Sequence, residues 1–164
     1  MAQNRREIIG RMMDRIIHRG PDMAGDYLGD EITLGFRRLS IIDLSEAGRQ
    51  PMVSDDGNVA LVLNGEIYNY MEIKKELIGK GHTFRSESDT EVLLHAWLEY
   101  GRALLDRIRG MFAFAIWDKR EKTLFMARDF FGIKPLYYTA LPDGGIMFGS
   151  EIKSFLEHPQ FSKR

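Results

Sequence analysis

The 164-residue chain contains no cysteine. This absence excludes a disulfide framework, a thiolate metal site and a cysteine nucleophile within the sequence. The chain also has no apolar run near the roughly 20 residues that span a bilayer, and its first residues lack the apolar core of a signal peptide. These absences predict a cytoplasmic protein without a membrane anchor.

The charge balance argues against nucleic-acid and membrane-surface binding. The formal net charge is -1, and no basic cluster offers a footprint for phosphate groups. The four histidines are scattered without metal-ligand spacing, so we expect no metal site. The hydrophobic share of 44% and the length together predict one folded domain, residues 1–164, with a proper core.

Helical signals gather in the first part of the chain. Ile8, Met12 and Ile16 repeat every four residues and predict an amphipathic helix that ends at residues 18–22, where Gly20 can take a positive φ and Pro21 cannot continue a helix. Asn69 is expected to cap a second helix, with Glu72 completing a capping box. Ser88 and Glu91 predict a third helix in the same way, ending before Gly101. A short helix is expected at residues 151–156.

Strand signals occur along the whole chain and dominate its second half. Strands are predicted at residues 25–28, 32–37, 59–63, 112–117, 123–127, 136–139 and 146–148, with a loop at 43–57 and a hairpin turn at 142–145. Residues 59–63 and 112–117 are apolar on both faces, which indicates sheets that are covered on both sides. Because helices come early and strands late, the pattern favours a layered α+β sandwich over regular βαβ winding.

Polar residues follow the buried strand at residues 59–63. Asn64 offers an amide and Gly65 a backbone N–H, and this pair of donors could form an oxyanion hole. The alternative is a polar turn that caps the next helix.

Two charged residues would suit a free amino acid. Arg38 ends a predicted strand and could hold a carboxylate bidentately, whereas Asp89, at a helix start, could hold an ammonium group. The alternatives are a surface cation and a helix cap.

Taken together, the ordered motifs resemble the class II glutamine amidotransferase domain of asparagine synthetases. The motifs lie at residues 18–22 (His-Arg-Gly-Pro-Asp), 38–43, 50–52, 64–69, 88–91, 110–117, 127–137 and 150–153. The resemblance runs from about residue 12 to residue 159. The proline in the first motif, Pro21, makes this motif similar to that of asparagine synthetases rather than to that of sugar-phosphate amidotransferases.

This resemblance implies an N-terminal nucleophile hydrolase fold, a four-layer αββα sandwich of two antiparallel sheets between helical layers. It also implies that L-glutamine is the substrate, that Arg38 holds its carboxylate, and that Asp89 and Glu66 hold its α-ammonium group. Asn64 and Gly65 would form the oxyanion hole. Arg19 would support the site.

The start of the chain departs from the family pattern. Family members begin with a cysteine just after the initiator methionine, followed by a Gly-rich apolar strand. This chain opens Met1-Ala2-Gln3-Asn4 and passes into the helix. We therefore expect that the nucleophile and its first strand, roughly 5–10 residues, are missing, and that this chain does not hydrolyse glutamine alone. A misassigned start codon, an expression boundary or a natural truncation would each give this sequence.

The resemblance also sets expectations about partners. The family continues into a larger synthetase domain that uses ATP and Mg²⁺, so no cofactor is expected in this domain. An unfilled strand position leaves backbone groups unpaired, and another segment or a second copy in a homodimer is expected to fill it. Besides the glutaminase domain, two alternatives remain: a non-catalytic glutamine-binding module, and a structural module that partners a separate synthetase chain.

Overall fold

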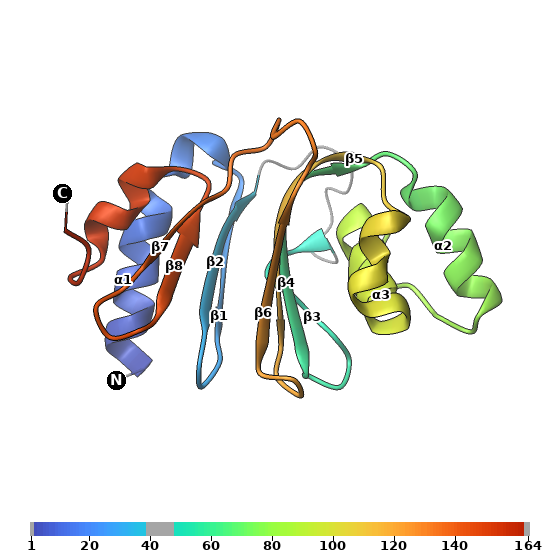
Figure 1. Cartoon of the computed structure of the whole chain (residues 1–164), viewed down its shortest axis with the longest axis horizontal. Coiled ribbons are helices and arrows are strands. Elements are labelled where there is room, and N and C mark those ends of the chain that lie inside the picture. Colours follow the sequence, from blue (N-terminus) through green and yellow to red (C-terminus); the bar gives the residue numbers. More distant parts are fainter. Residues whose placement is uncertain (1, 39–47, 163–164) are drawn as a thin grey trace.

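The computed structural model describes residues 2–38 and 48–162, which form four layers (Figure 1). Helix α1 (Ala2–Asp14) and the 3₁₀ segment η4 (Ile152–Glu157) form one outer layer. Helices α2 (Tyr70–Gly79) and α3 (Asp89–Tyr100) form the other. Two layers of antiparallel strands lie between them, so the predicted αββα sandwich is confirmed.

The strand layer beside α2 and α3 is a single sheet with the order β3-β4-β5-β6. Its strands are β3 (Met52–Val53), β4 (Val59–Ile67), β5 (Gly110–Asp118) and β6 (Thr123–Arg128). Apolar residues of β4 and β5 are buried on both faces, as predicted. One face packs against α2 and α3, and the other contacts β2 through Leu34.

The strand layer beside α1 consists of two separate hairpins. One pairs β1 (Met23–Leu28) with β2 (Thr33–Arg38), and the other pairs β7 (Tyr137–Ala140) with β8 (Ile146–Gly149). Figure 1 shows β8 and β2 next to each other, with α1 on the outer side of β8. Within the described residues, no strand pairs with the second edge of either β2 or β8.

A groove runs between these two strand edges. Two adjoining cavities, of about 540 and 120 Å³, are lined by Gly35 of β2 and Phe148 of β8, with Ile9 and Met12 of α1 on one side and Val62 of β4 on the other. We call this space the β2–β8 groove. Its two walls expose strand edges whose backbone groups can accept an additional strand.

The first helix ends earlier than its sequence pattern predicts. Helix α1 stops at Asp14, and a 3₁₀ turn, η1 (Ile17–Arg19), follows. Gly20 does not use the positive φ that glycine allows, since its φ is -158°. Glycine is needed there for proximity, since a Cβ at Gly20 would lie 2.3 Å from the carbonyl carbon of Arg37.

The two predicted capping boxes are only partly correct. Asn69 precedes α2 but makes no cap; its amide instead donates to the Arg107 carbonyl at 2.8 Å and accepts from the Arg109 N–H. Ser88 caps α3 by accepting from the Thr90 N–H at 3.1 Å.

The Glu91 carboxylate does not return to the Ser88 N–H. It accepts from the N–H groups of Arg85 and Ser86, which precede the cap. The loop before α3 is therefore tied to the helix by a different residue pair from the one that the sequence pattern predicts.

The remaining differences concern element boundaries. β4 continues to Ile67, so the polar residues 64–66 belong to the strand rather than follow it. The segment expected as a loop at 43–57 contains β3, and residues 39–47 lie outside the described residues. The predicted helix at 151–156 is the 3₁₀ segment η4. The hairpin turn is confirmed, with Gly144 at a φ of 86°. None of the helices in the described part of the chain is long and apolar enough to cross a membrane.

Candidate functional site

A cavity of about 480 Å³ lies at the C-terminal part of β4 and the start of α3. All five residues singled out from the sequence line it: Arg38, Asn64, Gly65, Glu66 and Asp89. They come from three elements, β2, β4 and α3. The fold thus brings the predicted residues together around one space, whose polar lining would suit a small charged molecule.

A buried glutamine amide holds two of these elements in place. Gln50 is 7% exposed, and its Oε1 accepts from the Leu63 N–H at 2.6 Å while its Nε2 donates to the Leu63 carbonyl at 3.2 Å. The same Nε2 donates to Thr90 Oγ1 at 3.1 Å. One side chain therefore fixes β4 against the first turn of α3 within the lining of the cavity.

Asn64 and Gly65 are held by the sheet. They pair with Ala113 and Phe112 of β5, so the alternative of a capping turn is wrong for these residues. Gly65 has a φ of 134°, and a Cβ there would lie 2.0 Å from the Met111 carbonyl oxygen. Asn64 lines the cavity, and its Nδ2 donates to Ser150 Oγ at 3.4 Å. Such a fixed donor is the kind of group that stabilises a developing oxyanion.

Asp89 supplies a buried negative charge. Its side chain is 6% exposed, and Oδ2 accepts from the Ile67 N–H at 2.9 Å. Burial raises the pKa of Asp89, the N–H groups of Ile67 and Thr90 oppose that rise, and the charge of Glu66 adds to it. Two carboxylates that repel each other in a shared cavity would both be stabilised by a bound cation.

Arg38 supplies the opposite charge. It ends β2, is 8% exposed, and lies against Gly48, where a Cβ would be 2.5 Å from the guanidinium Nη2. Arg38 Nη1 also contacts Met23 Sδ at 3.7 Å. The guanidinium is therefore confined by its neighbours, as a group that orients a carboxylate needs to be.

A second charged cluster lies beside the cavity, and of its members only Arg19 was singled out from the sequence. Glu151 accepts from His18 Nε2 at 2.8 Å and from Arg19 Nη1 at 3.3 Å, and Lys153 Nζ lies 3.0 Å from its other oxygen. Burial alone would raise the pKa of Glu151, but hydrogen bonds from Lys153, His18 and Arg19 lower it to about 2. The supporting role suggested for Arg19 therefore has a geometric basis, although no sequence signal pointed to Glu151 as its partner.

A match over all residues of the chain shows its family. A family model described as a glutamine amidotransferase domain matches residues 1–164. The chain belongs to this family. Its αββα sandwich is the N-terminal nucleophile hydrolase fold that the resemblance implied.

Named relatives and a solved structure agree with this assignment. The amidotransferase chain is 49% identical to asparagine synthetase [glutamine-hydrolyzing] 1 of Bacillus subtilis over 92% of its length, and 41% identical to asparagine synthetase [glutamine-hydrolyzing] 2 of Arabidopsis thaliana over 93%. It spans only 23% and 26% of those two proteins. In structure it is similar to a B. subtilis glutamine phosphoribosylpyrophosphate amidotransferase complexed with ADP and GMP, with a TM-score of 0.72 at 23% identity, covering 91% of this chain and 40% of that one. At that identity the likeness supports the fold.

Proposed function

We propose that this amidotransferase domain binds L-glutamine in the 480 Å³ cavity, as the ammonia-supplying domain of an asparagine-synthetase-like enzyme. Arg38 would pair with the α-carboxylate, and Asp89 and Glu66 with the α-ammonium group. The observation that supports this proposal is that the confined Arg38 guanidinium and the carboxylate residues Glu66 and Asp89 line one cavity. Free amino acids carry both charges, and paired, desolvated partners for each give orientation as well as affinity.

The side-chain amide of glutamine would lie toward Asn64 and Gly65. Attack on that amide makes a tetrahedral oxyanion, which the Asn64 Nδ2–H and a nearby backbone N–H would stabilise. The nucleophile of this family is a cysteine and the 164 residues contain none, so we infer that the attacking group is supplied from outside this chain. We infer that this chain alone binds glutamine without releasing glutamate.

The β2–β8 groove is the place from which a nucleophile would reach the cavity. Its inner part and the cavity share Arg19, Phe36, Arg37 and Asn64 as lining residues. An extended segment that pairs with β2 and β8 would therefore end beside Asn64. Main-chain hydrogen bonds from two open strand edges would provide the affinity for such a segment.

A peptide-complementation experiment tests the proposed function. The purified chain is mixed with L-glutamine and an extended ten-residue peptide that begins with cysteine and glycine and continues with small apolar residues. Glutamate release should appear with this peptide and not with a matched peptide that begins with alanine. A chain that binds L-glutamine but gives no glutamate with any cysteine peptide would favour a non-catalytic glutamine-binding module. A chain that binds no glutamine would favour a structural module that partners a separate synthetase chain, and would contradict the proposal.

The open groove also gives the homodimer hypothesis a location. Without a peptide, a second copy would pair with the edges of β2 and β8 to which no strand of residues 2–38 and 48–162 is bonded. We expect light scattering to detect a dimer that the peptide converts to monomer. A strictly monomeric chain at all concentrations would contradict this part of the proposal. We also propose that this domain needs no cofactor of its own, and that ATP and Mg²⁺ act in a separate synthetase domain.

A further inference from the structure

The side chain of Gln50 continues the pairing between β3 and β4 beyond the start of β3. In the antiparallel register Met52 lies opposite Leu61. Extended by two residues, this register places Gln50 opposite Leu63, where the Gln50 amide takes the part of a strand backbone. It accepts from the Leu63 N–H at 2.6 Å and donates to the Leu63 carbonyl at 3.2 Å. A side-chain amide has two N–H donors, so one donor is left for a further partner.

The remaining donor of Gln50 reaches α3. Its Nε2 donates to Thr90 Oγ1 at 3.1 Å, in the first turn of that helix. Both residues are buried, so a break in this link would leave polar groups without a partner inside the protein. The Gln50 side chain is therefore a buried polar link between the backbone of β4 and the first turn of α3.

A second link joins the same two elements. Asp89 Oδ2 accepts from the Ile67 N–H at 2.9 Å. On the helix, the two links use the neighbouring residues Asp89 and Thr90. On the strand, they use Leu63 and Ile67, which flank residues 64–66 of the cavity lining. The first turn of α3 thus holds both ends of the stretch of β4 that carries the proposed oxyanion donor.

We propose that Gln50 is a positioning residue that sets the length of the amino acid that the cavity accepts. This inference rests on the proposed function, in which Asp89 holds the α-ammonium group and Asn64 faces the side-chain amide. These two groups belong to different elements, so the separation of the elements decides which ligand reaches both groups at once. The Gln50 link fixes that separation. L-Glutamine then engages both ends, whereas L-asparagine, one methylene shorter, engages only one end at a time.

Two substitutions break the link at different points. Gln50→Met keeps the length of the side chain and removes all three hydrogen bonds of the amide. Thr90→Val keeps the shape of its side chain and both hydrogen bonds between Gln50 and Leu63, and removes only the step to α3. In either variant the helix can move relative to β4, so the shorter amino acid should be able to reach both ends of the cavity.

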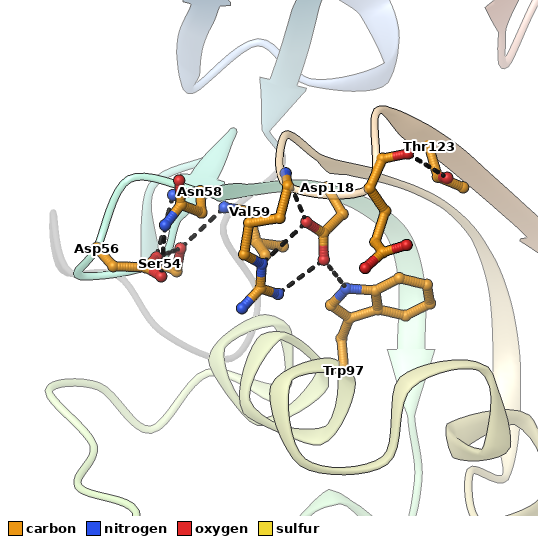
Figure 2. A network of polar contacts seen from close by, with 9 residues as sticks. Ser54, Asp56, Asn58, Val59, Trp97, Asp118 and Thr123 are labelled. Carbon is orange, nitrogen blue, oxygen red and sulfur yellow. Dashed lines mark hydrogen bonds and ion pairs between the residues drawn. The ribbon is translucent and has the colours of Figure 1, made fainter.

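Ser54→Ala is the matched control. Ser54 is buried like Gln50, and its Oγ accepts from the Val59 N–H at 2.9 Å, at the opposite end of β4 (Figure 2). Ser54 is not among the residues that line the glutamine cavity. Its substitution should lower the free energy of unfolding, as the loss of a buried hydrogen bond does, and leave the choice between amino acids unchanged.

Calorimetric titration with L-glutamine and with L-asparagine measures the selectivity, defined as the ratio of the two affinities. Urea denaturation of the same samples shows which variants are folded. The wild-type chain should bind L-glutamine about tenfold or more tightly than L-asparagine, the usual effect of one methylene. The selectivity should fall about threefold or more in Gln50→Met and in Thr90→Val, and should stay at the wild-type value in Ser54→Ala.

Each other outcome overturns the proposal in a recognisable way. Folded Gln50→Met and Thr90→Val variants with wild-type selectivity would show that Gln50 serves the fold alone; Thr90→Val decides the matter where Gln50→Met does not fold. An equal loss of selectivity in Ser54→Ala would show that any loosening of β4 has this effect. A wild-type chain that binds the two amino acids equally would overturn the proposal and leave the proposed function standing. A wild-type chain that binds neither would contradict both.

Discussion

Asp89→Asn removes one negative charge from the cavity wall and leaves an oxygen that can still accept from the Ile67 N–H. The matched control is Asp118→Asn. Both carboxylates are buried, with exposed fractions of 6% and 3%, but their pKa values shift in opposite directions. The pair therefore separates a residue poised for a ligand from a residue that serves the fold.

Asp118 is satisfied within the protein. Its carboxylate accepts from Arg120 at 2.7 and 3.0 Å and from the Trp97 indole Nε1 at 3.2 Å, as Figure 2 shows for Trp97. The hydrogen bond from Arg120, with support from Trp97, lowers the pKa of Asp118 against the effect of burial. Loss of a buried charge-assisted hydrogen bond costs about 1.5–3 kcal/mol, so Asp118→Asn should lower the free energy of unfolding by about 2 kcal/mol.

Asp89 has no such cation among the causes of its pKa shift. Burial and Glu66 disfavour its charge, so neutral asparagine should change the free energy of unfolding by less than about 1 kcal/mol. Glutamine affinity should nevertheless fall about ten- to a hundredfold, the equivalent of one charge-assisted hydrogen bond. Because the ammonium group binds the ionised form, wild-type affinity should also weaken as the pH falls toward the raised pKa of Asp89.

Urea denaturation and calorimetric titration with L-glutamine measure the two effects on the same samples. We expect Asp89→Asn to remain stable but to bind L-glutamine weakly. We expect Asp118→Asn to be destabilised but to bind L-glutamine with unchanged affinity when it is folded. An Asp89→Asn variant that loses more than 2 kcal/mol of stability and keeps its affinity would show that Asp89 serves only the start of α3. That result would refute the reasoning about the cavity.

Three further predictions address other parts of the chain. Gly65→Ala should lower the free energy of unfolding by about 2 kcal/mol or more, because Gly65 has a positive φ and a Cβ there would clash with the Met111 carbonyl. The control Gly10→Ala, in open space on α1, should raise the free energy of unfolding by about 0.5–1 kcal/mol. Equal urea midpoints for the two variants would contradict this prediction. Burial and the neighbouring His82 lower the pKa of His95 in the folded chain. Because the unfolded chain then binds more protons, the free energy of unfolding should fall as the pH drops from about 6.5, the unfolded pKa, through the folded pKa. Urea midpoints at pH 8 and about pH 5.5 measure this change. His95→Phe should flatten that slope, and an unchanged slope would count against the explanation. Arg38→Lys should weaken L-glutamine binding about tenfold in calorimetry, and equal affinity would argue against bidentate pairing.

Residues close in sequence allowed much of the fold to be predicted. The two-sided apolar runs at β4 and β5 identified the buried sheet, and the helix-period rows identified α1. Boundaries were less predictable because tertiary pairing decides them: Asn64 and Gly65 look like a turn, yet pairing with β5 keeps them in the strand. Asn69 has the chemistry of a cap, but Arg107 and Arg109 compete for its amide.

Some residues of the site could likewise be identified from the sequence, and others could not. Arg38, Asn64 and Asp89 stand next to recognisable strand or helix ends, so their chemistry could be singled out from the sequence. Gln50 and Glu151 could not, because their roles depend on contacts that sequence periodicity does not encode. Glu151 meets His18 across 133 residues, and Gln50 meets Thr90 across 40. Tertiary packing brings those partners together.

The most direct test of the central claim is an NMR titration of the purified chain with L-glutamine, with glutamate followed in the same tube. The account predicts saturable shifts of the Gly65, Glu66 and Asp89 amide signals, no such shifts with D-glutamine, and no glutamate above background. Glutamate release by the chain alone would show that another residue performs the chemistry. An absence of shifts at these three amides would contradict the assignment of the cavity to glutamine.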